Sequence, residues 1–333
     1  MQRIRLGLIG CGGIAAFHTK RLQQLQDVEI AAAADTNQRS LAEFCQRFEV
    51  ANAYVDYQEL LQSGFVDAVL VCVPTHLHAR IVCSAARAGK HVFCEKPLAR
   101  RLQDGRDVVA VCQEQGVILM VGFVRRFDAY WGTAKEVVDN GLLGTPCVWQ
   151  DIHSGSGPDH VPWFFEQDQG AGPLLDGMIH NIDFAGHMFG RAVEVQAGLT
   201  KFKSSSATDT GTVWVKYDSG NIMANFWSWG LPHGVSGING TAILGPNGVL
   251  LFPSGHTEET KGSYDENTEG AFLLVGRDGK REPIVYTKND MFLEEMRHFV
   301  TCVRENKTPL VTGNDGLEAL AVALAILGEE QLT

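Results

Sequence analysis

The fold is decided by the stretch IRLGLIGCGGIA at residues 4–15. A short apolar run over Ile4–Ile9 predicts a buried strand, and the glycines after it predict a tight turn into a helix. The turn fits the pattern G-x-G-x-x-G/A through Gly10, Gly12 and Ala15. Gly10 permits the tight turn, Gly12 lets a pyrophosphate approach the backbone, and Ala15 lets the helix pack on the strand. The stretch therefore predicts a dinucleotide site.

The residues after this turn bear on the choice of dinucleotide. The helix would present the N–H groups of its first turn, which includes Gly13 and Ile14, to the phosphates. Asp35 ends the next predicted strand and is followed by Thr36. A carboxylate there accepts hydrogen bonds from ribose hydroxyls and repels a 2′-phosphate, which favours NAD(H). Arg39 could neutralise a 2′-phosphate, so NADP(H) stays open.

Strand and helix patterns alternate throughout residues 3–121. Repeated strand–helix–strand units predict a parallel, doubly wound sheet, so the expected fold class is α/β, with a dinucleotide-binding domain over residues 1–122. The expected strands are Ile4–Ile9, Val28–Ala34, Val66–Val73, Lys90–Cys94 and Val117–Val121. The expected helices are Ala15–Leu25, Gln38–Phe48, His78–Ala88 and Leu102–Gln115.

The composition changes near residue 122, and all six Trp residues follow that point. Strand patterns now cluster without intervening helices, and two helices, about Met291–Glu305 and Leu317–Glu329, close the chain. We expect an α+β domain over residues 123–333, with a large, mostly antiparallel open sheet packed by helices on one face. Its expected strands are Cys147–His153, Val193–Phe202, Thr210–Tyr217, Asn221–Trp229 and Gly237–Leu244.

Charge and composition exclude several classes of function. The 333 residues carry a net charge of −11, which argues against binding nucleic acid or an anionic membrane. No apolar stretch is long enough to span a bilayer, and no signal-peptide pattern begins the sequence, so we expect a cytoplasmic protein. The eight cysteines include no C-x-x-C pair, which disfavours a disulfide framework or a structural zinc site.

A lysine follows the fourth strand of the predicted parallel sheet. Glu95-Lys96-Pro97 comes directly after that strand, at the carboxyl edge where doubly wound folds bind ligands. Beside a nicotinamide, Lys96 could donate or accept a proton. From position alone, a surface lysine paired with Glu95 is an equal alternative.

A second chemical motif lies in GAGPLLDGMIHNID, residues 170–183. After the structure-breaking start a helix is expected, on which Asp176 and His180 would be four residues apart and point the same way. An aspartate fixes the tautomer of a histidine and stabilises its charged form. The alternatives are a helix-start aspartate beside a core histidine and, less favoured, a zinc site. We expect no metal.

The order of these motifs resembles the glucose–fructose oxidoreductase/inositol dehydrogenase (Gfo/Idh/MocA) family. The motifs are GCGGIA, Asp35, VCVPTHLHA, EKP, VGFVRRFD and GAGPLLDGMIHNID, and the match runs to about residue 190. The resemblance implies a Rossmann domain followed by an α/β domain whose open sheet forms a homodimer or homotetramer. Two departures are Gly-Ala-Gly for three glycines and His76 where the family more often has Asn.

The resemblance also implies roles for individual residues. The catalytic lysine, aspartate and histidine of the family fall on Lys96, Asp176 and His180, and a substrate-contacting arginine falls on Arg125. A histidine near the nicotinamide falls on His78. Further cofactor contacts are expected from the same motifs, at Cys72, Pro74, Thr75 and Glu95.

Two more residues are candidate substrate contacts. Trp163 could stack on a sugar ring and His153 could bind hydroxyl groups, although core packing and a surface loop are the respective alternatives. The expected function is hydride transfer between nicotinamide and a secondary alcohol or ketone of a sugar or polyol ring. Two alternatives remain: an NADPH-dependent reductase of an activated or keto sugar, and a non-catalytic sensor. The sequence leaves open whether Lys96 or His180 accepts the proton.

Overall fold

The computed structural model describes residues 3–235, 237–253, 260 and 264–332. The chain forms two compact units. The first consists of Met1–Val124 and Asp290–Leu320, and the second of Arg125–Asn289 and Ala321–Thr333. This division differs from the predicted one, because Asp290–Leu320 belongs to the first unit rather than to the domain over 123–333.

The first unit contains a six-stranded sheet whose paired strands all run parallel. Its order is β3-β2-β1-β4-β5-β6, so the direction of winding reverses between β1 and β4. This confirms the predicted doubly wound fold and places a ligand crevice at the carboxyl ends of β1 and β4. The strands are β1 (Ile4–Ile9), β2 (Val28–Ala34), β3 (Asn52–Tyr54), β4 (Ala68–Val71), β5 (His91–Cys94) and β6 (Leu119–Val121).

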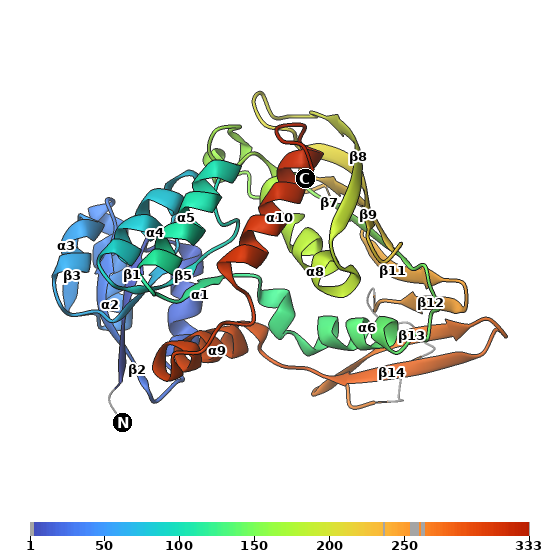
Figure 1. Cartoon of the computed structure of the whole chain (residues 1–333), viewed down its shortest axis with the longest axis horizontal. Helices are drawn as coiled ribbons and strands as arrows, with labels where there is room; N and C mark the ends of the chain where they lie inside the picture. Colours follow the sequence, from blue (N-terminus) through green and yellow to red (C-terminus); the bar gives the residue numbers. More distant parts are fainter. Residues whose placement is uncertain (1–2, 236, 254–259, 261–263, 333) are drawn as a thin grey trace. The chain divides into compact units, whose positions relative to one another are not determined.

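Helices cover this sheet, and α4 and α5 lie side by side on it (Figure 1). On α2 the apolar side chains of Leu41, Phe44 and Phe48 recur at helical spacing, and all three are buried, as the pattern predicts. The helices are α1 (Gly13–Leu22), α2 (Gln38–Phe48), α3 (Tyr57–Gln62), α4 (His78–Arg87), α5 (Leu102–Glu114) and α9 (Met291–Glu305); α10 (Gly313–Ile326) runs across the boundary of the units.

Helix α9 belongs to the first unit because its aromatic face packs there. The ring of Phe292 lies 4.7 Å from that of Phe17 on α1, and Phe299 lies 5.7 Å from Phe93 on β5. Asp290 caps the helix and pairs with a side chain of α1. The periodicity of residues 291–305 predicts this helix with its observed bounds, but it does not identify the surface on which the helix packs.

The second unit contains an eight-stranded sheet of order β14-β13-β12-β11-β7-β10-β9-β8 (Figure 1). Neighbouring strands of this sheet pair antiparallel, except β7 with β10, which confirms the predicted mostly antiparallel sheet. The strands are β7 (Val148–Ser154), β8 (Ala192–Thr200), β9 (Thr210–Tyr217), β10 (Ile222–Ser228), β11 (Gly240–Gly245), β12 (Gly248–Leu251), β13 (Glu269–Gly276) and β14 (Arg281–Thr287).

At β9, one face of this sheet is packed and the other is open, as predicted. Val213, Val215 and Tyr217 of this strand are buried, whereas Thr212 and Lys216 are exposed. The covering helices are α6 (Ala129–Asp139), α7 (Pro173–Asp176) and α8 (Ile179–Phe189). Of the helices that the structure describes, none is both long and apolar enough to cross a membrane.

Candidate active site

Strand register brings four predicted site residues into one row in the first unit. Ile9 pairs with Ala34 and with Val71, and Val71 pairs with Cys94. The residues that follow these strand ends therefore lie side by side at the carboxyl edge, in the order Asp35, Gly10, Cys72 and Glu95. Residues far apart in the sequence thus converge where the winding reverses.

The glycine turn between β1 and α1 leaves room for a phosphate group. Gly10 has a positive φ of 92°, and a methyl group added there would lie 2.3 Å from the carbonyl oxygen of Cys72. A methyl group added at Gly12 or Gly13 would instead project into open space. Because the first N–H groups of a helix have no acceptor within it, the turn and α1 fit the pyrophosphate of NAD(P).

Asp35 lies against this turn. Its carboxylate accepts hydrogen bonds from the backbone N–H groups of Cys11, at 2.8 Å, and Asn37, at 2.7 Å. These bonds fix the carboxylate beside the glycines while leaving it partly exposed, which suits an acceptor for ribose hydroxyls.

The other predicted cofactor contacts differ in their exposure. Ile14 and Thr36 are exposed beside the glycine turn. The side chain of Arg39 is 88% exposed and pairs with Glu43 on its own helix, at 2.8 Å. Cys72 and Thr75 are buried, and Pro74 begins the short turn Thr75–Leu77 after β4.

Lys96 follows β5 in the same row, at a cis Lys96–Pro97 peptide bond. Its backbone N–H donates to Oε2 of Glu95, at 3.2 Å. Oε1 of the same carboxylate lies 2.5 Å from Nε2 of His18 on α1. The pKa of Glu95 is lowered, because the hydrogen bond from His18 and the nearby Lys96 outweigh the cost of burial. Glu95 is thus a buried carboxylate held on both sides.

His78 lies between the turns that follow β4 and β5. Its Nδ1 lies 2.7 Å from the carbonyl oxygen of Pro97, and its Nε2 lies 2.8 Å from that of Val73. The ring is buried, and burial lowers its pKa. Because both nitrogens face backbone carbonyls, His78 joins the turns after β4 and β5, and its place near a nicotinamide stays a prediction.

In the second unit, Asp176 and His180 lie on two short helices instead of the single predicted one. Helix α7 ends at Asp176 and α8 begins at Ile179. Gly177 and Met178 between them keep right-handed helical dihedrals, so Asp176 and His180 stay about one turn apart. Asp176 is 7% exposed, and His180 is half-buried.

The joint between α7 and α8 is shaped by an aromatic ring. A methyl group added at Gly177 would lie 2.2 Å from the ring of Trp227 on β10. On β7, the ring of His153 lies against the same indole, 4.4 Å away and tilted by 31°. His153 is exposed overall, although burial lowers the pKa of its ring. The structure therefore places His153 and the Asp176–His180 joint against one aromatic side chain.

A buried hydrogen-bond chain holds α8 on the sheet. Asn181, next to His180, donates from Nδ2 to Oδ2 of Asp151 on β7, at 2.8 Å. Trp227 donates to the same oxygen from Nε1, at 3.2 Å. Asn181 and Asp151 were missed in the sequence analysis. The available signal was a charged residue, Asp151, on the inward face of a predicted strand.

Arg125 belongs to this chain, and its contact with substrate stays a prediction. It donates from Nη1 to Oδ1 of Asn181, and its guanidinium lies 4.3 Å from the ring centre of Trp131. Burial lowers the pKa of Arg125 to about 10, against the opposite effect of Asp151. These contacts with Asn181 and Trp131 give Arg125 a structural role in the chain.

Trp163 lies in a short 3₁₀ turn, Pro162–Phe165, within the second unit. Its ring stacks on that of Phe164, with 3.9 Å between the ring centres and 27° between the planes. The indole is half-buried, so part of it stays accessible for stacking on a ligand.

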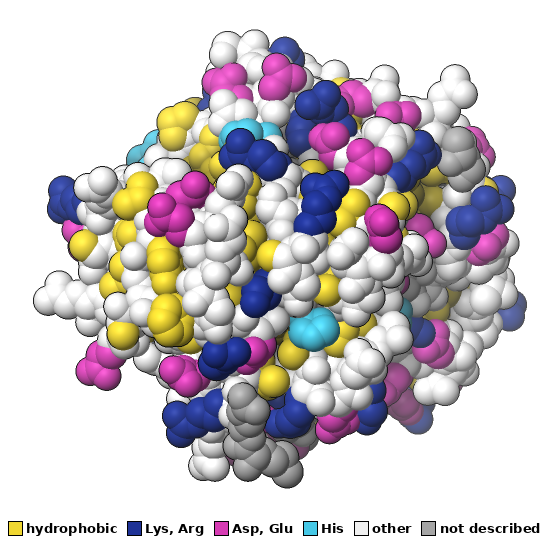
Figure 2. Space-filling model, turned by 60° about the vertical axis from the view of Figure 1, so that its left-hand side comes forward, with side chains coloured by type: hydrophobic (Ala, Val, Ile, Leu, Met, Phe, Trp, Pro, Cys, Tyr) yellow, Lys and Arg dark blue, Asp and Glu magenta, His cyan; other side chains and the backbone are white. Residues whose placement is uncertain are grey.

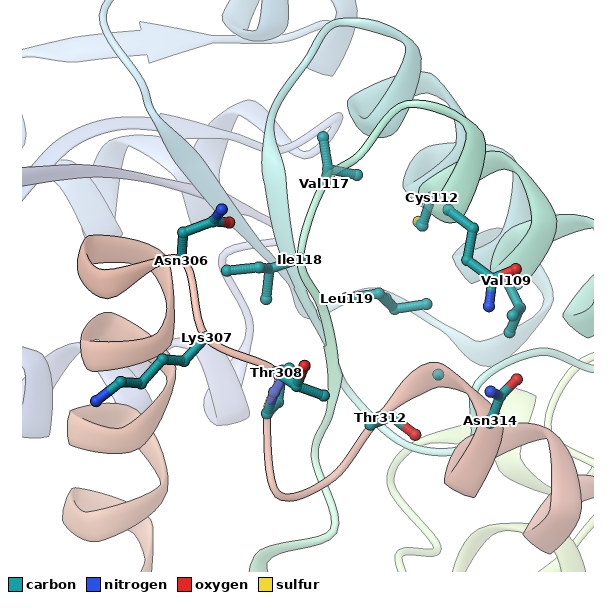
Figure 3. Close-up of a pocket in the computed structure, with 13 residues that line it drawn as sticks. Val109, Cys112, Val117, Ile118, Leu119, Asn306, Lys307, Thr308, Thr312 and Asn314 are labelled. Atoms are coloured by element: carbon teal, nitrogen blue, oxygen red, sulfur yellow. The ribbon is translucent and has the colours of Figure 1, made fainter.

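A pocket of about 350 Å³ opens elsewhere in the first unit (Figure 3). It lies between Val109 and Cys112 on α5, Leu119 on β6, and the segment from Asn306 to Asn314. The residues just before β6 line it, so it lies at the amino end of that strand, away from the carboxyl-edge row. Its charged residue, Lys307, pairs with Glu305 at 2.6 Å. The pocket holds none of the predicted site residues.

Acidic and basic side chains are interspersed on the molecular face drawn in Figure 2. That face thus offers no continuous basic surface of the kind that binds nucleic acid. Within the described ranges, no group of three His, Cys, Asp or Glu side chains is arranged to hold a metal ion.

Comparison with known proteins agrees with this geometry. Residues 4–123 match a family described as "Oxidoreductase family, NAD-binding Rossmann fold", and residues 131–250 match the "GFO/IDH/MocA C-terminal domain". The chain is 32% identical to the myo-inositol 2-dehydrogenase of Thermotoga maritima, over 97% of this chain and 95% of that protein. The chain belongs to the Gfo/Idh/MocA family of oxidoreductases.

Two further relatives support the same assignment. The scyllo-inositol 2-dehydrogenase (NAD(+)) of Bacillus subtilis is 26% identical to this Gfo/Idh/MocA protein, over 97% of this chain and 93% of that one. The crystal structure of a probable dehydrogenase from Thermotoga maritima superposes with a TM-score of 0.74, at 29% identity over 98% and 96% of the two chains. The first unit is therefore an NAD(P)-binding Rossmann domain.

We predict that Gly12→Ala weakens NADH binding about tenfold or more, equivalent to about 1.4 kcal/mol, without lowering the stability of the ligand-free protein. The added methyl group meets no protein atom and projects where the pyrophosphate would lie. Fluorescence titration with NADH and thermal unfolding measure the two effects. Gly132→Ala, in α6, also adds a methyl group in open space and serves as the control. NADH affinity equal to wild type in Gly12→Ala would contradict the placement.

Proposed function

We propose that this Gfo/Idh/MocA protein is an NAD-dependent dehydrogenase that oxidises a secondary alcohol of a cyclic polyol or pyranose. The observation that carries the proposal is the position of Lys96, directly after β5 in the same edge row as the glycine turn. A lysine there lies beside the crevice in which doubly wound sheets bind a dinucleotide. The named inositol dehydrogenases among the relatives favour an inositol or similar ring as substrate.

The preference for NAD rests on Asp35. Its carboxylate is fixed beside the glycine turn, where it accepts hydrogen bonds from ribose hydroxyls and repels a 2′-phosphate. Arg39, the nearby cation that would favour NADP, pairs with Glu43.

The roles of the reacting groups follow from their chemistry. When bound, NAD would supply the hydride-acceptor chemistry, and the protein supplies placement and proton transfer. Either the His180 imidazole or the neutral amine of Lys96 accepts the hydroxyl proton. The protonated form of Lys96 stabilises the developing alkoxide. Asp176 orients His180 and balances its charge. Asn181 supports this arrangement by fixing the start of α8 to Asp151.

Three side chains of the second unit are proposed to bind the substrate ring. His153, stacked on Trp227, offers a hydrogen-bonding nitrogen for a hydroxyl group. Trp163 offers a half-exposed indole face for the apolar side of a sugar. Arg125, which Asn181 and Trp131 hold in place, is proposed as a third substrate contact through its remaining N–H donors.

The proposal is tested by a substrate panel. The purified protein is mixed with NAD⁺ or NADP⁺ at about pH 9, where proton release favours oxidation, and with inositols, pyranoses, anhydro-sugars and sugar acids in turn. Appearance of reduced nicotinamide with one class of ring supports the proposal and identifies the class. Silence throughout the panel, with NADH binding intact, would contradict it and favour a reductase of an activated or keto sugar, or a sensor.

We predict that Lys96→Met abolishes turnover and leaves NADH affinity nearly unchanged. The thioether keeps the length of the side chain but carries no proton and no charge. Steady-state rates on the best substrate and NADH titration measure the two effects. The control is Lys20→Met on the exposed side of α1, which we expect to behave as wild type. Near-normal turnover in Lys96→Met would remove Lys96 from the mechanism.

We predict that Asp35→Ser lowers the preference for NADH over NADPH by about tenfold or more. The substitution removes the carboxylate that repels a 2′-phosphate and leaves a hydroxyl group in its place. The ratio of the two dissociation constants, measured by fluorescence, is the readout. A ratio equal to that of the wild type would show that Asp35 makes no contact near the ribose.

We also propose that the protein forms a homodimer or homotetramer through the open face of the second sheet. Val193, Leu244 and Val285 are apolar residues of β8, β11 and β14 that are each more than 40% exposed. Association would remove these side chains from water. Sedimentation velocity is expected to show a dimer or tetramer, and a monomer at micromolar concentration would contradict the proposal.

A further inference from the structure

A buried cluster of ionisable side chains lies behind the Lys96 turn, inside the first unit. It consists of His18 on α1, Glu95 after β5, and Glu295 on α9, whose residues are 0%, 8% and 1% exposed. Burying such groups is costly unless they pair with one another. Neither His18 nor Glu295 has a part in the mechanism proposed above.

Glu95 connects this cluster to the backbone of Lys96. One carboxylate oxygen accepts from the Lys96 N–H, and the other lies 2.5 Å from Nε2 of His18. In the imidazole tautomer with its proton on Nε2, that nitrogen donates to Glu95 and Nδ1 is an acceptor. That Nδ1 atom is buried and has no hydrogen-bond partner.

Glu295 faces the same region from α9. Phe292, Glu295 and Phe299 are spaced three and four residues apart, so they lie on one face of the helix. The ring of Phe292 is 5.9 Å from that of His18, and the ring of Phe299 contacts Phe93, two residues before Glu95. Glu295 lies between these two contacts, and it interacts electrostatically with Glu95.

Glu295 has the hydrogen-bond donor that Nδ1 of His18 lacks. Both its oxygens are buried and have no hydrogen-bond partner. Burial, together with the negative charge of Glu95, raises the pKa of Glu295 well above its ordinary value, which favours its protonated form. A protonated carboxyl group can donate to Nδ1 of His18, after a side-chain rotation or through one water molecule.

The remaining ionisable groups near Glu95 do not change which of Glu295, His18 and Glu95 donate and which accept hydrogen bonds. They are Lys96, His78 and the thiols of Cys72 and Cys94. Burial raises the pKa of both thiols and lowers that of His78, so all three are neutral. The charge of Glu95 therefore faces the ammonium group of Lys96 and the imidazole of His18.

We propose that Glu295, His18 and Glu95 form a buried hydrogen-bond chain that positions Lys96. In this chain Glu295 donates to His18, His18 donates to Glu95, and Glu95 accepts from the Lys96 backbone. Glu295 and His18 are thus positioning residues, which act through Glu95. The hydrogen-bond chain is inferred from the contacts above, and only the catalytic role of Lys96 rests on the proposed function.

The first test is the pH dependence of stability. A carboxyl group whose pKa is higher in the folded than in the unfolded protein stabilises the fold only while it is protonated. Its contribution is complete below about pH 4.5 and is lost as the pH rises above that value. Thermal unfolding between pH 5 and 8 should show a smaller loss of stability in Glu295→Gln than in the wild type. Glu294→Gln is the control and should keep the wild-type slope, because this neighbouring side chain is 40% exposed and pairs with Arg297.

The second test separates positioning from structural support. Glu295→Gln keeps a donor and should retain kcat within about twofold. Glu295→Leu and His18→Gln break the chain and should lower kcat about tenfold, because small displacements of a reacting group are costly. In both, KM and NADH affinity should change by less than about twofold, since Lys96 is misplaced while the binding surfaces remain.

Each adverse outcome has a distinct meaning. Equal pH slopes in the wild type and Glu295→Gln would overturn the protonated Glu295. An infrared carboxylic-acid band that is present in wild type and absent in Glu295→Gln at neutral pH would support it. Unchanged kcat in folded His18→Gln, with Lys96→Met inactive, would overturn the positioning role and leave the proposed function standing. Normal turnover in Lys96→Met would instead contradict the proposed function, while the pH slopes would still decide the state of Glu295.

Discussion

The close contact between Gly10 and the carbonyl oxygen of Cys72 is the constraint on which the candidate site of the first unit depends. A side chain at Gly10 would lie 2.3 Å from that oxygen, so any other residue would push apart the ends of β1 and β4. Because these two ends stay together, Asp35 reaches the N–H group of Cys11, and Glu95 follows in the same row. Because Gly10 has no side chain, the glycine turn, Asp35 and the turn at Lys96 can lie in one row.

In the second unit a glycine also permits a close contact, here between an aromatic ring and the joint of two helices. Gly177 lets the indole of Trp227 approach the joint between α7 and α8. The same indole donates to Asp151, which also accepts from Asn181. Asp176 and His180 therefore lie on either side of a joint that is fixed to the sheet by an aromatic ring and a buried carboxylate. Precise placement of reacting groups depends on such secondary contacts.

Local sequence patterns predict many helices and strands of this protein with their bounds. They do not predict which elements pack against one another. The bounds of β1, α2, β9 and α9 agree with the expected ranges, because each has an unbroken periodicity and clear ends. The short strand Asn52–Tyr54 has too few residues to show a period, and helix Ala129–Asp139 carries Gly132 and mixed polarity. The strands over 269–287 were not predicted either.

For the candidate site, sequence reasoning found the glycine turn and Asp35, and the structure places both at one sheet edge. It assigned His78 and Arg125 to ligand contacts, and the structure adds protein partners for both that it did not predict. Those partners come from turns, a strand and helices distant in sequence, so no local pattern could show them. The break at Gly177 has the same cause, since Trp227 lies fifty residues further along the chain.

The late position of α9 in the chain affects how the protein is made. Its Phe292 and Phe299 complete the packing of α1 and β5, yet they leave the ribosome only after the whole of Arg125–Asn289. At about 5–20 residues per second, this interval lasts roughly 10–30 s. During that time the nascent first unit exposes the surface around Phe17, His18 and Phe93. Completion of its core therefore waits for synthesis of the other unit, which makes this surface the part of the newborn chain that most needs protection from aggregation.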